Sequence, residues 1–282
     1  MKIGFIDYYL DEWHANNYPA KLKELSGGEI EVAYAFAEID SPLPGGMTTN
    51  EWCEKNHIQR VDSIEELIAL SDGIVVLSPD NCERHEQLCR LPLASGKRCY
   101  VDKTFAPDEK TARRIFQNAE EHGTPCYSSS ALRFATEYAP IKKEAIRSLS
   151  SWGPACGGGN GYETYVIHQL EPIMMLMDSA PKRVMMHPIE SWYAMTIEFE
   201  DGRYATLSGY TGGSPFMMNI QYDEGAQLVN VESDYFEEFL KSLADFFMTG
   251  DIKVPHETTV HIMAAREAGL RAMQQPDTWI EV

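Results

Sequence analysis

The segment from Asp72 to Ala106 constrains the fold more than any other part of the chain. Gly73 to Leu77 is a short apolar run of the kind expected for a strand that is covered on both faces. A polar turn, a helix over Glu83 to Ala94 and a second strand at Arg98 to Val101 follow it. Strand, helix and strand in this order predict a parallel sheet with a helical crossover.

The same alternation runs through the first 128 residues. The pattern predicts further strands at 2–6, 29–36 and 125–128, and helices at 18–25, 51–56, from Ser63 onward and at 108–122. A Pro/Gly-rich loop is expected at 40–49. Residues 1–128 are therefore predicted to form a Rossmann-like α/β domain with a parallel sheet.

Beyond residue 128 the pattern changes. Helices are expected at 136–149 and 165–177, with a glycine-rich loop at 151–161 between them. Alternating strand patterns fill 182–231, and the sequence Glu200-Asp201-Gly202 predicts a hairpin turn. Two helices, at 235–249 and 257–273, close the chain. Residues 129–282 are predicted to form an α+β domain with a mostly antiparallel sheet.

Charge and composition exclude several classes of partner. Lysine and arginine number 24 against 43 aspartate and glutamate residues, a net charge of −19. Nucleic acids and anionic membranes bind basic surfaces, so neither is expected as a partner. No apolar run approaches the roughly 20 residues needed to span a bilayer. The N-terminus also turns acidic before a signal-peptide core could form, so a cytoplasmic location is expected.

Cysteine and histidine spacing gives no sign of a metal site. The six cysteines form no C-x-x-C pair, and the histidines outside the candidate sites show no spacing typical of metal ligands. Reduced, buried thiols and no bound metal are predicted.

Polar residues follow two of the predicted strands. Ser78, Pro79 and Asn81 come after the strand at 73–77, and Asp102-Lys103-Thr104 comes after the strand at 98–101. Ligands of open parallel sheets bind just beyond the carboxyl ends of the strands, so these residues form a candidate site. His85 either caps and packs its helix or contributes to that site.

The order S-P-D-N-x3-H, helix, G-K, strand, D-K resembles the nucleotide domain of the glucose-fructose oxidoreductase / inositol dehydrogenase (Gfo/Idh/MocA) family. In that family the lysine of an E-K-P motif works at the substrate. Here the motif reads Asp102-Lys103-Thr104, which keeps the lysine and loses the proline. The resemblance covers nearly the whole chain.

That resemblance implies an NAD- or NADP-dependent oxidoreductase acting on a small-molecule substrate, namely a sugar, polyol or related carbohydrate derivative. It also implies a homodimer or homotetramer that packs through the C-terminal sheet. The cofactor-binding residues that it implies are Asp7, Tyr8, Ser78, Pro79, Asn81, His85 and Lys103.

The turn after the first strand departs from the dinucleotide pattern G-x-G-x-x-G. Its glycine positions hold Asp7, Tyr9 and Glu12, and carboxylates here oppose a pyrophosphate. NAD(P) in an altered pose, loss of the cofactor and binding of a different ligand all remain open. Glu38 or Asp40 is a candidate for holding a ribose. The rings of Tyr8, Tyr9, Trp13 and His14 either pack over a vacated pocket or form a sugar-stacking surface.

A second centre runs from Gly157 to Glu171 and resembles the family motif G-G-x-x-x-D-x-G-x-H-x-x-D. His168 matches the catalytic histidine and Glu171 replaces the final aspartate. Thr164 falls where the catalytic aspartate belongs, and Glu163 is one position away.

The resemblance implies that Lys103 and His168 share proton transfer at a substrate hydroxyl. Lysine with a lowered pKa and histidine are both suited to acid–base chemistry near neutral pH. Tyr165 and Arg133 are further substrate-binding candidates, and Arg133 alternatively forms a salt bridge between the two domains. The competing hypothesis is a chain without redox turnover, either a binding subunit or a lyase or isomerase that uses the same Lys/His pair.

Overall fold

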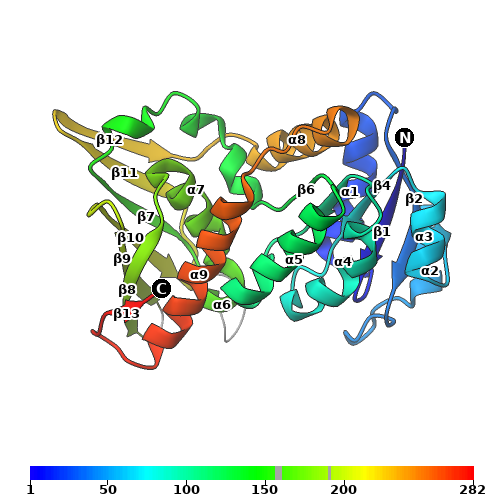
Figure 1. The fold of residues 1–282 in the computed structure, drawn as a ribbon, viewed down its shortest axis with the longest axis horizontal. Helices are drawn as coiled ribbons and strands as arrows, with labels where there is room; N and C mark the ends of the chain where they lie inside the picture. The colour runs from blue at the N-terminus through cyan, green and yellow to red at the C-terminus, as the bar shows by residue number, and fades with distance from the viewer. Residues whose placement is uncertain (156–160, 190–191) are drawn as a thin grey trace. The chain divides into compact units, whose positions relative to one another are not determined.

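The computed structural model describes residues 1–155, 161–189 and 192–282. Internal contacts divide the chain into two compact units (Figure 1). Unit 1 comprises residues 1–129 and 239–256, and unit 2 comprises residues 130–238 and 257–282. Residues 239–256, which the sequence-based division assigns to the second domain, thus belong to unit 1.

Unit 1 contains a sheet of six parallel strands, which confirms the Rossmann-like prediction. The strands are β1 (Lys2–Asp7), β2 (Glu31–Ala37), β3 (Gln59–Arg60), β4 (Gly73–Val76), β5 (Cys99–Val101) and β6 (Cys126–Tyr127). Their order is β3-β2-β1-β4-β5-β6, so the strand order reverses between β1 and β4. In sheets of this kind the reversal marks the ligand-binding edge.

Helices cover both faces of this sheet. They are α1 (Trp13–Leu25), α2 (Thr49–Asn56), α3 (Ile64–Leu70), α4 (His85–Leu93), α5 (Glu109–Glu121) and, in its later part, α8 (Tyr235–Thr249). Successive side chains of a strand point to opposite faces. Tyr100 packs on Phe239 of α8, and Cys99 lies near Cys89 of α4. Helices α8 and α4 therefore lie on opposite faces.

Helix α1 begins earlier than predicted. The sequence indicated a helix at 18–25, whereas α1 runs over Trp13–Leu25 with Pro19 inside it. The cause is Glu12, which caps the helix with its side chain and so allows it to begin directly after the β1 turn.

Unit 2 contains a sheet of seven strands in the order β12-β11-β7-β10-β9-β8-β13. The strands are β7 (Ser148–Pro154), β8 (Pro181–Ile189), β9 (Trp192–Phe199), β10 (Tyr204–Tyr210), β11 (Met217–Tyr222), β12 (Gly225–Asn230) and β13 (Ile280–Glu281). All pairs of these described strands are antiparallel except β7 with β10. This confirms the predicted mostly antiparallel sheet, and Gly202 (φ 83°) forms the predicted hairpin between β9 and β10.

Unit 2 also contains the helices α6 (Gly161–Tyr165), α7 (Ile167–Met177) and α9 (His256–Met273). Only the first residue of α9, His256, is assigned to unit 1. Ser151 of β7 bonds Gln169 of α7, and Tyr162 of α6 contacts Met195 of β9. Among the residues that the structure describes, no helix is long and apolar enough to cross a membrane.

The helix predicted at 136–149 is wrong. This stretch forms the short 3₁₀ turns η3 (Thr136–Tyr138) and η4 (Lys143–Ala145) and then enters β7. Pro140 lacks the amide that a continuous helix requires, and β7 pairs along both edges with β10 and β11. Residues 151–154 of the predicted loop are part of β7, and the loop residues 156–160 lie outside the described residues.

Candidate functional site

The N-terminus of α1 in unit 1 is capped by the side chain of Glu12. Its Oε2 accepts a hydrogen bond from the amide of His14 (2.6 Å), and its Oε1 accepts one from the amide of Ala15. These amides belong to the first turn of the helix and point out of its positive end. Glu12 is only 7% exposed, so its carboxylate is held inside unit 1.

Asp7 lies at the carboxyl end of β1 and is 1% exposed. Its Oδ1 accepts the amide of Tyr8 at 2.6 Å, whereas the buried Oδ2 has no hydrogen-bond partner among the described residues. Burial, followed by the charge of Glu12, raises the pKa of Asp7 well above its ordinary value. A carboxyl group in this environment favours the protonated form.

His14 and Asp102 form an ion pair at the same edge of the sheet. Nδ1 of His14 lies 2.5 Å from Oδ2 of Asp102, and Oδ1 of Asp102 accepts the hydroxyl of Tyr100 at 3.2 Å. Burial acts to raise the pKa of Asp102, but the charge and hydrogen bond of His14, together with the charges of Lys103 and His85, outweigh burial and lower it. An ionised carboxylate only accepts hydrogen bonds, so Nδ1 of His14 carries a proton.

Lys103 follows Asp102 directly and is partly buried. The loop that carries it is held by His85, whose ring nitrogens face the carbonyl oxygens of Leu77 (2.7 Å) and Phe105 (3.0 Å). His85 is fully buried, and burial lowers its pKa. In this structure His85 therefore joins the end of β4 to the Lys103 loop instead of presenting a surface to a ligand.

The remaining cofactor candidates lie in the turn after β4 and around Tyr8. Ser78 is buried with a left-handed backbone (φ 87°), and its hydroxyl donates to the carbonyl of Asn81 at 3.2 Å. Pro79 is buried, and the side chain of Asn81 donates to Glu83. The ring of Tyr8 lies under the guanidinium of Arg84, 4.6 Å from ring centroid to Cζ.

Glu38 and Asp40, the two acids predicted to hold a ribose, both accept hydrogen bonds from other residues of unit 1. Glu38 accepts the side-chain amide of Gln87 at 2.7 Å and lies 3.9 Å from Arg84. Asp40 accepts the amide of Thr49, in the first turn of α2, at 2.7 Å.

These contacts bear on whether a dinucleotide fits. In a Rossmann-type domain the pyrophosphate lies against the amides that open the helix after β1. Here the amides of His14 and Ala15 already donate to Glu12. The described turn therefore does not fit a pyrophosphate while Glu12 holds its position.

A separate network surrounds His168 in unit 2. The hydroxyl of Ser130 lies 2.7 Å from Nδ1 of His168. Glu171, one turn further along α7, accepts the amide of Ser130 at 3.2 Å and the guanidinium of Arg133 at 2.8 Å. Arg133 thus forms a salt bridge within unit 2, and the network fixes the histidine against the segment that enters this unit.

The other residues predicted around His168 lie on α6. The ring of Tyr165 meets that of His168 edge to face, with centroids 4.5 Å apart. The main-chain carbonyl of Glu163 accepts from the buried Arg266 (2.8 Å), and its carboxylate lies 3.9 Å from the same guanidinium. Thr164 lies between Glu163 and Tyr165 on α6 and is partly buried.

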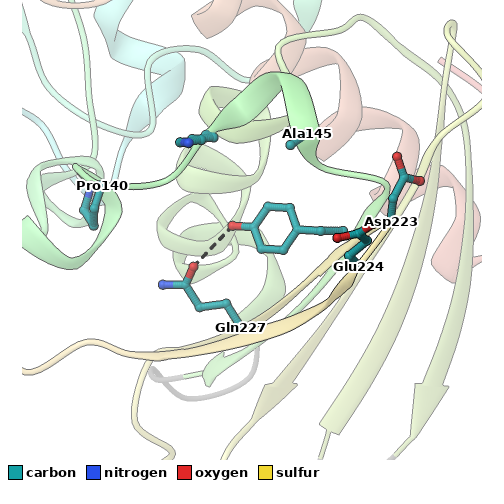
Figure 2. Close-up of a pocket in the computed structure, with 7 residues that line it drawn as sticks. Pro140, Ala145, Asp223, Glu224 and Gln227 are labelled. Carbon is teal, nitrogen blue, oxygen red and sulfur yellow. Dashed lines mark hydrogen bonds between the residues drawn. The ribbon is translucent and has the colours of Figure 1, made fainter.

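A shallow hollow of about 460 Å³ lies elsewhere in unit 2 (Figure 2). Tyr222 donates to Gln227 across it at 3.2 Å. Its lining consists of Pro140, Lys142, Ala145, Tyr222, Asp223, Glu224 and Gln227. None of the predicted site residues is among them.

Sequence reasoning missed the cap formed by Glu12 and the pair formed by His14 and Asp102. The available signal for the cap was an acid directly before a run that can open a helix. The ion pair joins residues 88 positions apart, which spacing does not reveal. Among residues 1–155, 161–189 and 192–282, no group of three or more metal-ligating side chains is arranged to hold a metal ion.

No family model and no curated protein matches the sequence. Solved structures match it over the whole chain at low identity. A probable dehydrogenase from Thermotoga maritima is 13% identical with a TM-score of 0.79, covering 100% of this chain and 98% of its own. A scyllo-inositol dehydrogenase from Lactobacillus casei is 14% identical with a TM-score of 0.78, covering 99% and 97%.

A third similar structure is a UDP-N-acetylglucosamine 3-dehydrogenase from Acidithiobacillus ferrooxidans. It is 14% identical with a TM-score of 0.77 and covers 96% of this chain and 97% of its own. These structural neighbours are dehydrogenases of the Gfo/Idh/MocA type, so the predicted resemblance is confirmed at the level of the fold.

Proposed function

Because the chain has the fold of Gfo/Idh/MocA-type dehydrogenases, we propose that it is an oxidoreductase acting on a sugar, polyol or related carbohydrate derivative. A scyllo-inositol dehydrogenase of similar fold was solved with NAD(H) and scyllo-inositol bound, which supports a nicotinamide nucleotide as the cofactor class. NAD and NADP are both retained in this proposal.

The observation that carries the proposal is the placement of His168. Its Nδ1 is fixed by Ser130, and Glu171 ties the same serine to Arg133. A histidine held in one orientation is suited to accept or return the proton of a substrate hydroxyl. Lys103, at the carboxyl end of β5 in unit 1, is proposed as the second proton-handling residue.

The test is a carbohydrate and polyol screen with each nucleotide, followed by the absorbance of reduced nicotinamide. Removing one general acid or base typically lowers turnover by about 10²- to 10⁴-fold. We therefore expect His168→Asn and Lys103→Met each to lose activity on that scale. Absence of calorimetric binding by NAD(H) and NADP(H), together with no turnover in the screen, would refute the oxidoreductase proposal.

A second candidate is an isomerase or lyase that uses the same residues without redox turnover. The contacts of Glu12 favour it, because they oppose a pyrophosphate at α1. Such an enzyme would exchange a carbon-bound hydrogen of its substrate with solvent when no nucleotide is added. Incorporation of deuterium from D₂O, followed by NMR across the same screen, separates the two candidates. A binding subunit would show neither reaction.

A further inference from the structure

We infer that the carboxylate of Glu12 occupies the anion site of α1 and competes there with phosphate groups, so that removing this side chain opens the site. This inference stands on the geometry of unit 1 and does not depend on which reaction the chain catalyses. The competing ligand is an oxyanion, either inorganic phosphate or pyrophosphate or the diphosphate of a nucleotide.

The location of the cap is the first step of the argument. Helix α1 has 13 residues and follows β1, beside the point where the strand order reverses toward β4. The free amides and dipole of such a helix attract an anion. Both oxygens of Glu12 accept amides of the first turn, one each from His14 and Ala15, so the anion bound there belongs to the chain itself.

Asp7 supplies the second, independent observation. Its Oδ2 is buried and has no hydrogen-bond partner among the described residues, although Oδ1 accepts the amide of Tyr8. Buried polar atoms are nearly always paired, so an unpaired one points to a missing ligand atom. Asp7 ends β1 and Glu12 caps α1 across the short turn that joins them, and the charge of Glu12 acts on Asp7.

The protonation of Asp7 indicates which ligand atom is missing. Burial favours the protonated carboxyl, and its Oδ2 hydrogen is then a donor that lacks an acceptor. A phosphate oxygen is such an acceptor. The amides of His14 and Ala15 and the Asp7 carboxyl would together give three donors to an oxyanion once Glu12 is removed.

The test compares Glu12→Ser with the wild-type chain. Serine keeps a short, uncharged capping hydroxyl, which a bound oxyanion can displace from the amides of the first turn. Asp108→Ser is the matched control, because Asp108 caps α5 with its side chain by accepting the amide of Thr111 at 2.7 Å. Binding of inorganic pyrophosphate is measured at pH 8, above the pKa of about 7 that burial gives Glu12. Calorimetry and the rise of the melting temperature report binding, with circular dichroism to verify folding.

We expect Glu12→Ser to bind pyrophosphate at least about tenfold more tightly than the wild type, a difference of about 1.4 kcal/mol. Asp108→Ser should behave as the wild type does. Should Glu12→Ser fail to fold, Glu12→Gln removes the charge at nearly constant size and should show a smaller gain of the same sign. Equal affinity of variant and wild type, whether both bind or neither does, overturns the inference.

A parallel titration with NAD⁺ separates this result from the proposed function. Tighter pyrophosphate binding without NAD⁺ binding by either chain supports the role of Glu12 and argues against a nucleotide-dependent reaction. Tight NAD⁺ binding by the wild type, with no tighter pyrophosphate binding by Glu12→Ser, supports a nucleotide-dependent reaction and argues against the role of Glu12.

Discussion

Burial raises the pKa of Glu12 to about 7 from its ordinary value of 4.5, although the charge of His14 and two amides act to lower it. Between these values the native state holds a proton that the unfolded chain has lost. This group therefore makes stability fall as the pH rises through that window. Glutamine at position 12 cannot titrate. The unfolding free energy of Glu12→Gln relative to that of the wild type should therefore increase from pH 5 to pH 8.

The expected gain is on the order of 2 to 3 kcal/mol, since one pKa unit corresponds to about 1.4 kcal/mol. Urea unfolding of both chains at the two pH values measures it. The charge of Glu12 contributes to the raised pKa of Asp7, so both chains are compared in an Asp7→Asn background, where residue 7 cannot titrate. A difference in unfolding free energy that is independent of pH would contradict the assignment of this titration to Glu12.

Asp102 shows the opposite shift at the same edge of the sheet. Its lowered pKa means that the pair with His14 contributes stability above the ordinary value of 3.8, lost only as the pH falls through the still lower folded value. Removing one partner of a buried ion pair costs about 3 to 5 kcal/mol. We expect Asp102→Asn to lower the unfolding free energy by about that amount at pH 7.

An exposed ion pair provides the control for this substitution. Asp223 pairs with Arg147 at 2.5 Å on the surface of unit 2. Surface pairs contribute at most about 1 kcal/mol, so Asp223→Asn should change the unfolding free energy little. Similar losses in the two variants would show that the contact between His14 and Asp102 is not specially stabilising.

At the scale of the elements, α8 is the piece that the sequence assigned differently. Phe239 is 1% exposed and packs on Tyr18 (5.9 Å) and Tyr100 (5.5 Å), centroid to centroid. Truncating a buried phenylalanine costs about 3 to 5 kcal/mol. We expect that loss for Phe239→Ala in urea unfolding, whereas Met248→Ala, on the exposed side of α8, should stay within about 0.5 kcal/mol.

The elements also show what the sequence can predict. Strand β4 was identified because a parallel strand buried on both faces is a continuous apolar run. Strand β7 was not, because Lys142 to Leu149 favours a helix locally and only pairing with β10 and β11 makes it extended. Local propensity is a weak prior where such long-range pairing exists.

The same division applies to the candidate site. The positions of Asp7 and Lys103 at the ends of β1 and β5 were predictable because the ends of parallel strands are readable from the sequence. The contacts of Glu12 and His14 were not predictable, because they depend on where α1 begins and on a residue 88 positions away from His14. Strand ends are local features, whereas the hydrogen bonds made at them depend on the tertiary fold.

At the scale of the whole molecule, one face of the seven-stranded sheet carries several exposed large side chains. Ser151 of β7 faces α7, so its neighbour Ser150 lies on the other face. The strand registers place Leu228, Asn219, Ser150 and Thr206 in one row across that face. Tyr204 and Tyr210 lie on the same face of β10, and Leu228, Tyr204 and Tyr210 are 62%, 41% and 37% exposed.

We propose that a second copy of the chain covers this face, because it exposes Leu228, Tyr204 and Tyr210 and the family resemblance implies packing through this sheet. Light scattering after gel filtration should then give a multiple of the 31.9 kDa chain mass.

Tyr210→Glu buries a charge in such an interface and should shift the protein toward the monomer. Leu43→Glu, at a more exposed apolar position of unit 1 (54%), should leave the oligomeric state unchanged. High salt should favour assembly, since two chains of charge −19 repel each other and salt screens that repulsion. A wild-type chain that elutes as a monomer at every salt concentration would exclude this interface.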